Sequence, residues 1–369
     1  MDLSGQKLKK KIIMIKVEIV ADSANSFGDR LTSLVLTYPR IIHSEMMTHR
    51  MFSRNASSSR AVPVDKMIKA VRENTFCPFE FQKSHKGMQG SEYFTGADRQ
   101  ECINLWLESA ELALQQAEKM KAKGISKQII NRILEPYQYY TVLITGSIEG
   151  WQNFFNLRCP SYKLIGLDEE NVKSRKEWLE KIQFSSALHP SMYPKTDVEW
   201  LQINKGQAEI HIMDLSEKIY DAVNESTPRQ LQAGEWHIPM ISDSGSLKLS
   251  TNDQIKLSVG RAANTSYTVV GDGKKLTLEQ AVRIHDKCKE LNHSSVFEHC
   301  ARAMSDEEWQ EFYKGRLYRN KMEYYIRNHS NDYVDTEILE PYSELENGWC
   351  NNFKGFIPYR YMIDNNLKV

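Results

Sequence analysis

A run of hydrogen-bond donors at residues 48–63, called the donor run below, is the part of the sequence best suited to chemistry. THRMFSRNASSSRAVP holds three arginines, one histidine and four serines, and it holds no aspartate or glutamate. A guanidinium group binds phosphate through two parallel hydrogen bonds, and serine hydroxyls can complete the contacts. A solvated surface loop is the ordinary alternative, but ordinary surfaces mix charges of both signs. The donor run therefore predicts a site for a phosphorylated ligand.

Composition restricts the classes of function. The chain has 369 residues, and Lys+Arg and Asp+Glu both total 48, so the formal net charge is zero. A neutral chain argues against a nucleic-acid coat or a membrane-surface protein. No apolar run reaches the roughly 18 residues of a transmembrane helix. The six cysteines form no CxxC pair, so we expect reduced thiols in a cytoplasmic protein and no metal site.

The segments next to the donor run have recognisable patterns. Residues 31–42 directly precede it and are rich in β-branched side chains, which predicts one or two strands. Residues 12–20 predict a first strand, and 141–150 a short strand or turn. Helices are predicted from apolar spacing at 65–74, 97–123, 126–134 (ending before Pro136), 151–158, 206–223, 277–292 and 307–328. Strands and long helices without regular βαβ alternation predict the α+β class.

Two helix starts and two boundaries are also predicted. Thr277 with Gln280, and Ser305 with Glu308, have the spacing of capping boxes. Residues 159–205 are polar and proline-rich, which indicates an irregular insertion. Residues 243–253 form the best candidate linker. We therefore expect a core at 1–240 with an insertion at about 160–204, and a C-terminal part at 241–369 that packs into the same catalytic domain.

The donor run resembles the signature RHRxxSxNExSxR of the flavin-dependent thymidylate synthases (the ThyX family). Six of the eight specified positions match without gaps: His49, Arg50, Ser53, Asn55, Ser58 and Arg60. Two positions depart, because Thr48 stands for the first arginine and Ala56 for the glutamate. The resemblance implies a central, mostly antiparallel sheet flanked by long helices.

Five further segments are similar to family motifs. NRILEP, NFFNLR and GQAEI follow the donor run in the family's order. RAANTSY (261–267) resembles a strand end, and NHSSVFEHC (292–300) resembles a helix end. In the usual family order these last two precede the donor run, so the chain resembles a circularly permuted, phage-associated branch. The resemblance covers most of residues 15–300, but not 160–204 or the C-terminal segment.

The resemblance implies roles for particular residues. The positions that match contacts to deoxyuridine monophosphate (dUMP) are Glu45, Ser58, Arg60, Arg132 and Arg158, of which Ser58 and Arg158 are the catalytic candidates. The positions on the FAD side are His49, Arg50, Asn55, Asn153, Leu157, Ser266, His293, Ser295 and Glu298. In the family the counterparts of Arg132 and Arg158 come from another subunit, so a homotetramer with shared active sites is implied. Simple helix packing is the alternative for Asn153 and Leu157, and helix capping is the alternative for His293.

The implied reaction is the reductive methylation of dUMP to dTMP, with FAD, NADPH and methylenetetrahydrofolate. The chain has no Pro-Cys-His sequence, so a cysteine nucleophile of the kind that other thymidylate synthases use is not expected. The departures at Thr48 and Ala56 leave two alternatives open. One is a flavin enzyme that modifies another pyrimidine nucleotide or hydroxymethylates it, and the other is a non-catalytic nucleotide-binding relative. Arg360, near the C-terminus, is a candidate to replace lost contacts.

Overall fold

A computed structural model describes residues 15–87, 90, 92–164, 171–183, 193–196, 199–200, 203–204, 206–243, 245–267, 276–315 and 345–368. Within them no helix combines the length and the apolar character that crossing a membrane requires.

A five-stranded sheet forms the centre of the fold, in the order β3-β4-β2-β1-β7. Its strands are β1 (Lys16–Ala24), β2 (Arg30–Pro39), β3 (Ser53–Ala56), β4 (Tyr139–Ser147) and β7 (Arg229–Gln230). Every pairing is antiparallel except that of β7 with β1. The α+β class with a mostly antiparallel sheet is confirmed. The segment predicted as a short strand or turn is instead the full-length strand β4, because β2 and β3 both pair with it.

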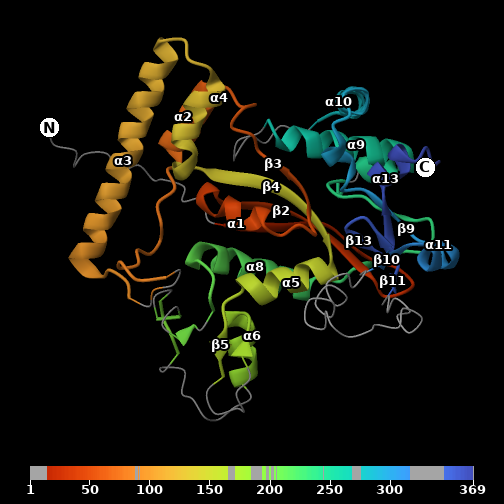
Figure 1. Ribbon diagram of the computed structural model, residues 1–369, viewed down its shortest axis with the longest axis horizontal. Coiled ribbons are helices and arrows are strands. Elements are labelled where there is room, and N and C mark those ends of the chain that lie inside the picture. The colour runs from red at the N-terminus through yellow and green to blue at the C-terminus, as the bar shows by residue number, and fades with distance from the viewer. Residues whose placement is uncertain are drawn as a thin grey trace, which may run out of the picture.

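Helices α5 (Ile148–Arg158) and α8 (Ile210–Glu225) cover one face of this sheet (Figure 1). Strand side chains alternate between the two faces, so Leu34, Val142 and Ile144 share a core with Phe154 and Ile212. The prediction of helices at 151–158 and 206–223 is confirmed in type, although the first begins earlier and the second later.

C-terminal elements cover the other face and the β3 edge. They are β8 (Trp236–His237), α9 (Thr251–Thr265), the 3-10 helix η5 (Ser294–Phe297), β9 (Ala301–Ala303), β13 (Phe353–Lys354) and β14 (Phe356–Pro358). Leu31 of β2 packs there with Ala301 and Phe356. RAANTSY was expected at a strand end, but it lies at the end of helix α9. Since α9 packs against β3 and β4, this motif still reaches the sheet.

Helices α10 (Leu278–Glu290) and α13 (Tyr359–Asp364) complete this end of the molecule. The capping box of Thr277 and Gln280 is confirmed, and so is that of Ser305 and Glu308. The prediction of one long helix at 307–328 is wrong in its length. Helix α11 (Asp306–Glu311) is short, and strand β10 (Tyr313–Gly315) follows it. Strand β10 pairs with β11 (Leu345–Asn347), and β12 (Trp349–Cys350) pairs with β13. Residues 316–328 lie outside the described residues.

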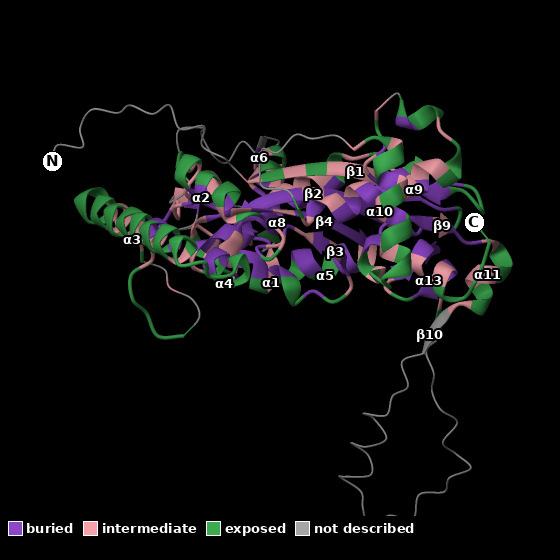
Figure 2. Ribbon diagram, turned by 90° about the horizontal axis from the view of Figure 1, so that it is seen from above, coloured by how far each residue is buried: buried purple, intermediate pink, exposed green. Residues whose placement is uncertain are grey.

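A helical layer lies at the opposite end of the sheet (Figure 1). It contains α2 (Val64–Glu73), α3 (Gly96–Ala122), α4 (Lys127–Ile130) and the 3-10 helix η2 (Asn131–Tyr137). The first two confirm the helices predicted there. The helix predicted at 126–134 is wrong in its end. The α-helix α4 ends at Ile130, and the 3-10 helix η2 continues through Pro136. Figure 2 shows that much of α3 is exposed, and only Ala110, Leu114 and Ala117 are buried.

The predicted insertion is less irregular than expected. It contains β5 (Tyr162–Lys163), β6 (Asn171–Val172) and α6 (Arg175–Gln183). These elements have an apolar cluster of their own, made by Tyr162, Leu164, Val172, Trp178, Ile182 and Trp200. The predicted linker at 243–253 contains the 3-10 helix η4 (Ser246–Lys248) and the start of α9. The division of the chain into a core and a C-terminal part remains a prediction.

Candidate active site

The donor run leaves the short helix α1 (His43–Met47), turns through residues 48–52 and enters strand β3. Arg54 Nη1 donates to the carbonyl oxygens of Met46 (3.2 Å), Met47 (3.0 Å) and His49 (3.1 Å). The last carbonyls of a helix have no partner inside it, and Arg54 supplies one. Arg54, one of the three arginines in the donor run, therefore has a structural role.

Arg54→Ala is expected to lower the free energy of unfolding by at least roughly 1.5–3 kcal/mol, which is the contribution of one hydrogen bond to a charged group. Urea denaturation measures the change. Arg283→Ala is the matched control, because the side chains of Arg283 and of its ion-pair partner Glu279 are both exposed on α10. An unchanged denaturation midpoint for Arg54→Ala would contradict the structural role.

The N-terminal end of the donor run is hydrogen-bonded to Arg158, the last residue of α5. Arg158 Nε lies 3.0 Å from His49 Nε2, and Arg158 Nη2 lies 3.1 Å from Thr48 Oγ1. Because arginine Nε always carries a hydrogen, His49 accepts at Nε2 and bears its proton on Nδ1. Burial, with the charges of Arg158 and Arg54, lowers the pKa of His49 to about 4. His49 is thus a neutral acceptor that orients Arg158.

This contact differs from one expectation and explains one departure. Arg158 was expected to come from another subunit, yet it reaches the donor run of its own chain. Thr48, which replaces the first arginine of the signature, accepts from Arg158 and donates to the carbonyl of Glu45 (2.7 Å). A second arginine at this position would repel Arg158, so threonine suits the arrangement. Glu45 itself is half-buried in α1.

The second end of the donor run is held by two other segments. Asn131 Nδ2 donates to the carbonyls of Ser59 (2.6 Å) and Val62 (2.9 Å). The Ser58 N–H donates to the carbonyl of Ser266 (3.0 Å), so the structure brings these two predicted site residues together. Arg60 is exposed on this loop. No described residue forms an ion pair with Arg50 or Arg60, so both charges are open to a ligand.

Arg132 follows Asn131 and points away from the buried core. Its side chain is exposed, and it pairs with Glu135 at 3.2 Å. No contact of Arg132 with another predicted site residue is found in the described part of the chain. Arg158 therefore contacts the N-terminal end of the donor run directly. Arg132 lies near the C-terminal end because its neighbour Asn131 contacts Ser59 and Val62.

The C-terminal segment lies against the middle of the donor run. Asn352 Nδ2 donates to the carbonyl of Arg50 (3.2 Å). Arg360 forms an ion pair with Glu298 and lies 3.5 Å from Asp364. The basic residue proposed to replace lost contacts therefore neutralises Glu298, one of the predicted flavin-side residues.

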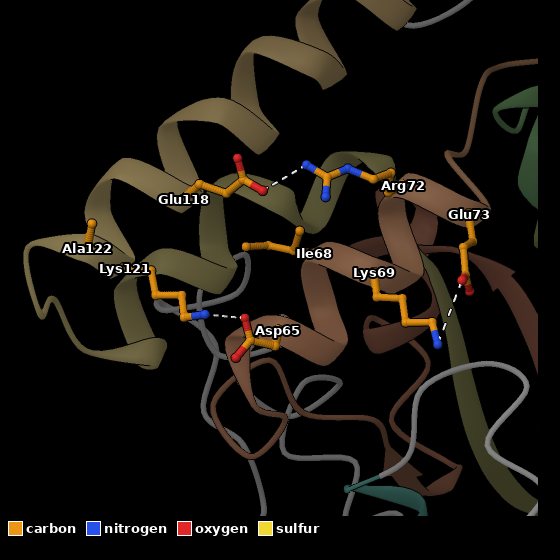
Figure 3. A pocket seen from close by; sticks show the side chains of 8 residues that line it. All are labelled: Asp65, Ile68, Lys69, Arg72, Glu73, Glu118, Lys121 and Ala122. Atoms are coloured by element: carbon orange, nitrogen blue, oxygen red, sulfur yellow. Dashed lines mark hydrogen bonds and ion pairs between the residues drawn. The ribbon is translucent and has the colours of Figure 1, made fainter.

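A pocket of about 320 Å³ opens where these segments meet. Its lining residues are Ser53, Glu298, Asn351, Asn352, Phe353, Pro358, Arg360, Tyr361 and Asp364. Two larger grooves, each of about 490 Å³, lie elsewhere, between α2 and α3 (Figure 3) and between α6 and α8. In the groove of Figure 3, Arg72 pairs with Glu118 at 2.8 Å and Lys121 pairs with Asp65. Because these charges are already neutralised, the groove is a poor phosphate site.

Most of the remaining predicted residues lie on the surface near the donor run. Asn153 and Leu157 are exposed on α5, with Leu157 at 57%, so packing inside this chain does not explain them. His293 and Ser295 are exposed as well. The His293 N–H donates to the carbonyl of Cys288 (2.9 Å), which is the helix-end role considered as its alternative. Asn55 is buried, and its Oδ1 lies 3.2 Å from His299 Nε2.

Comparison with protein families gives an independent result. Residues 30–163 match the family described as "Thymidylate synthase complementing protein". Over these residues the chain is similar to that family. The resemblance found in the sequence is thereby confirmed for the segment that holds the donor run, Arg132 and Arg158. A comparison with curated proteins found no match.

Two solved structures of a UMP/dUMP methylase, PolB from Streptomyces cacaoi, are similar to the chain. The structure with 5-Br UMP is 15% identical, has a TM-score of 0.38, and the alignment covers 57% of this chain and 89% of that chain. The structure with 5-Br dUMP is 14% identical, has a TM-score of 0.34, and the alignment covers 57% and 96%.

Several residues that contact the donor run were not predicted from the sequence. Asn131 and Arg54 hold the donor run, and His299 contacts Asn55. The signal for His299 was present, since it closes the motif NHSSVFEH. Arg54 falls on an unspecified position of the signature, whereas Arg50 and Arg60 match specified ones, but nothing local indicated that Arg54 binds the end of α1.

Proposed function

We propose that the protein is an FAD-dependent thymidylate synthase that converts dUMP to dTMP with methylenetetrahydrofolate and NADPH. One observation carries the proposal. Arg50 and Arg60 stand exposed on the donor run without an ion-pair partner among the described residues, next to the junction of Ser58 with Ser266. Two open guanidinium groups beside hydroxyls suit phosphorylated ligands. The family match supplies the class of ligand.

The residues present fit FAD as a bound group. Arg50 offers a free guanidinium to its phosphates, and Asn153 and Leu157 offer an exposed polar and apolar surface on α5. Ser266, His293 and Ser295 add polar groups from the other side of the donor run. When bound, the flavin supplies the hydride chemistry that makes a cysteine nucleophile unnecessary.

The nucleotide is assigned to Arg60, Ser58 and Arg158. Arg60 and Ser58 bind the phosphate of dUMP, and Arg158 donates to the uracil side. Two of the five N–H donors of Arg158 are used by His49 and Thr48, which leaves donors for a carbonyl oxygen. Because neutral His49 fixes its orientation, Arg158 can stabilise negative charge without rearranging. Ser58 and Arg158 are therefore the catalytic candidates.

No cysteine is expected to be essential. Burial raises the pKa of the Cys159, Cys300 and Cys350 thiols to about 12, so these groups stay protonated, and a thiol is a poor nucleophile. Replacing each of the six cysteines by alanine in turn should leave turnover of the folded protein largely unchanged. Turnover per bound flavin measures this, with circular dichroism as the control for folding. A single replacement that abolishes turnover in a folded protein would refute the mechanism.

Self-association is part of the proposal. Leu105 and Leu112 on α3 are 60% and 52% exposed, and residues seven apart share one helix face. Exposed Leu157 and Arg132 lie at the site. A neighbouring subunit would cover these apolar surfaces and receive Arg132. We propose a homotetramer with shared active sites, in which residues 241–369 belong to the same catalytic unit and supply permuted motifs.

The deciding experiment incubates the purified protein with dUMP, NADPH and methylenetetrahydrofolate and identifies the nucleotide product. Formation of dTMP by a yellow protein that sediments as a tetramer is expected. A hydroxymethylated product, or turnover of another pyrimidine nucleotide only, would replace the proposed reaction by the related one. A colourless monomer that binds nucleotide without turnover would identify a non-catalytic relative.

A further inference from the structure

Helix α3 lies at the outer edge of the molecule and presents one long stripe of side chains to solvent (Figures 1 and 2). The residues of this stripe, called the α3 stripe below, are Asp98, Glu101, Leu105, Glu108, Leu112, Gln116, Lys119 and Lys123. All of them are exposed. Successive members are three or four residues apart, so they share one face of the helix.

Charge is ordered along the α3 stripe. The acidic residues occupy its N-terminal half, and the lysines occupy its C-terminal end. The nearest opposite charges, Glu108 and Lys119, are 11 residues apart, which is too far for a pair within one helix. Like charges are closer, because Lys119 and Lys123 are one turn apart, and such a pair destabilises a helix. This order of charges therefore gains no ion pair from α3 itself.

The side of α3 that faces α2 has a different arrangement. There Glu118 pairs with Arg72 at 2.8 Å, and Lys121 pairs with Asp65 (Figure 3). In the described part of the chain, no ion pair involves a charged residue of the α3 stripe. The charges toward α2 are thus satisfied within the chain, while those of the stripe stay open to a partner.

A second copy of α3 complements the stripe when the two helices run antiparallel. A two-fold axis near residues 110–111 places Glu101 against the partner's Lys119 and Asp98 against the partner's Lys123, because both pairs are centred on that point. The axis repeats each contact, so opposite charges meet at both ends. In a parallel pair each residue would face its own counterpart, and like charges would meet instead.

The middle of the α3 stripe fits the same arrangement. Leu105 and Leu112 are 60% and 52% exposed, and they lie on either side of the axis. An antiparallel pair brings the leucines of both copies together at the centre, with the charges outside them. An apolar centre with charged flanks is how paired helices associate in coiled coils.

We propose that α3 is a self-association surface and pairs antiparallel with α3 of a second copy, across a two-fold axis near residues 110–111. The proposal rests on the homotetramer proposed above, in which this contact is one of the isologous interfaces. It adds which helix forms that interface, in which direction the helices run, and which charges decide the direction.

The helix dipole is the other physical reason for acidic residues near the start of a helix and lysines near its end. That effect fades within the first and last turns, whereas Glu101 lies in the second turn of α3. It also gives no reason for the exposure of Leu105 and Leu112. The two explanations predict opposite results when the charges at both ends are reversed together.

Charge reversal at each end tests the pairing. Asp98→Lys/Glu101→Lys and Lys119→Glu/Lys123→Glu each make like charges meet. Sedimentation equilibrium should then show particles of half the wild-type mass and a dissociation constant raised by roughly 10- to 100-fold. The variant with all four substitutions restores opposite charges and should regain the wild-type mass. The dipole alone would make that variant the most impaired.

Two further measurements accompany the reversals. A mixture of the two end variants should also regain the wild-type mass, because a basic stripe then meets an acidic one. Leu105→Gln/Leu112→Gln should raise the dissociation constant by roughly 10- to 100-fold through lost apolar burial. Leu247→Gln is the matched control, since Leu247 on η4 is 57% exposed, and it should leave association unchanged. Circular dichroism checks the folding of every variant.

These measurements need neither flavin nor nucleotide, so they are distinct from the test of the proposed reaction. End variants with the wild-type mass, or a mixture of them that stays at half mass, would overturn the pairing while leaving a homotetramer to another surface. A wild-type monomer would refute both the pairing and the homotetramer. Pairing through α3 in a protein that forms no dTMP would refute the proposed reaction and leave the interface established.

Discussion

Replacing Arg60 with lysine is expected to weaken dUMP binding by roughly 10- to 150-fold while FAD stays bound, since losing a hydrogen bond to a charged group costs about 1.5–3 kcal/mol. Arginine presents a planar fork to phosphate, and lysine presents a point charge. The substitution therefore keeps the charge and removes one of two directed bonds. A dUMP titration followed by flavin absorbance measures the dissociation constant.

The structure argues against Arg54 as the phosphate ligand and leaves Arg60 exposed. Arg54 is committed to carbonyl oxygens at the end of α1, so it is not available to phosphate. The backbone around Arg60 is fixed by Asn131 and by the contact of Ser58 with Ser266. A held backbone lowers the entropy lost when the side chain binds.

Arg283→Lys on α10 is the matched control, because it makes the same chemical change at an exposed residue that forms an ion pair with Glu279. It should leave the dissociation constant unchanged. If Arg60→Lys also binds dUMP normally with full flavin content, the phosphate assignment is wrong, and Arg50 becomes the remaining candidate in the donor run.

A second large effect is expected in acid. His237 and His299 should together lower the free energy of unfolding by about 4 kcal/mol between pH 7 and pH 5. Burial lowers the pKa of each ring to about 3. The unfolded chain takes up protons near pH 6.5 and the folded chain does not, so stability falls as the pH falls from about 6.5 toward 3.

The environment of the two rings explains why they stay neutral. The hydroxyls of Ser23 and Ser33 contact His237, and the Thr145 hydroxyl and the Asn55 amide contact His299. None of these four groups is ionised. The charge of Asp22 raises the pKa of His237 and that of Arg229 lowers it, but burial is the dominant cause. A protonated ring carries a hydrogen on both nitrogens, so it can no longer accept a hydrogen bond from a neighbouring hydroxyl.

Urea denaturation at pH 7, 6 and 5 tests this expectation, with the double variant His237→Gln/His299→Gln as the comparison. Only the change in unfolding free energy with pH is compared, so any loss caused by the substitutions themselves cancels. The double variant should lose about 4 kcal/mol less than wild type over this interval. Parallel pH dependences would show that the two rings do not control acid stability.

Much of the local structure could be predicted from the sequence. Helices α2 and α3 and both capping boxes follow from apolar spacing and from side chains three residues apart. The donor run and its family signature were visible because they are contiguous. The class of fold could therefore be predicted, and the kind of ligand could be proposed. These features depend on interactions between residues that are close in sequence, and such interactions leave a pattern in the chain.

The tertiary structure decided which residue does what. Three arginines of the donor run look alike in sequence, yet Arg54 binds a helix end and Arg60 stays open. Strand β4 was underestimated because its length is set by pairing with β2 and β3. His299 and Asn55 are 244 residues apart, and only sheet register and the packing of η5 bring them together. Buried polar groups must find partners wherever folding places them, so the partners of Asn55, His49 and Arg158 depend on the packed fold and not on local sequence.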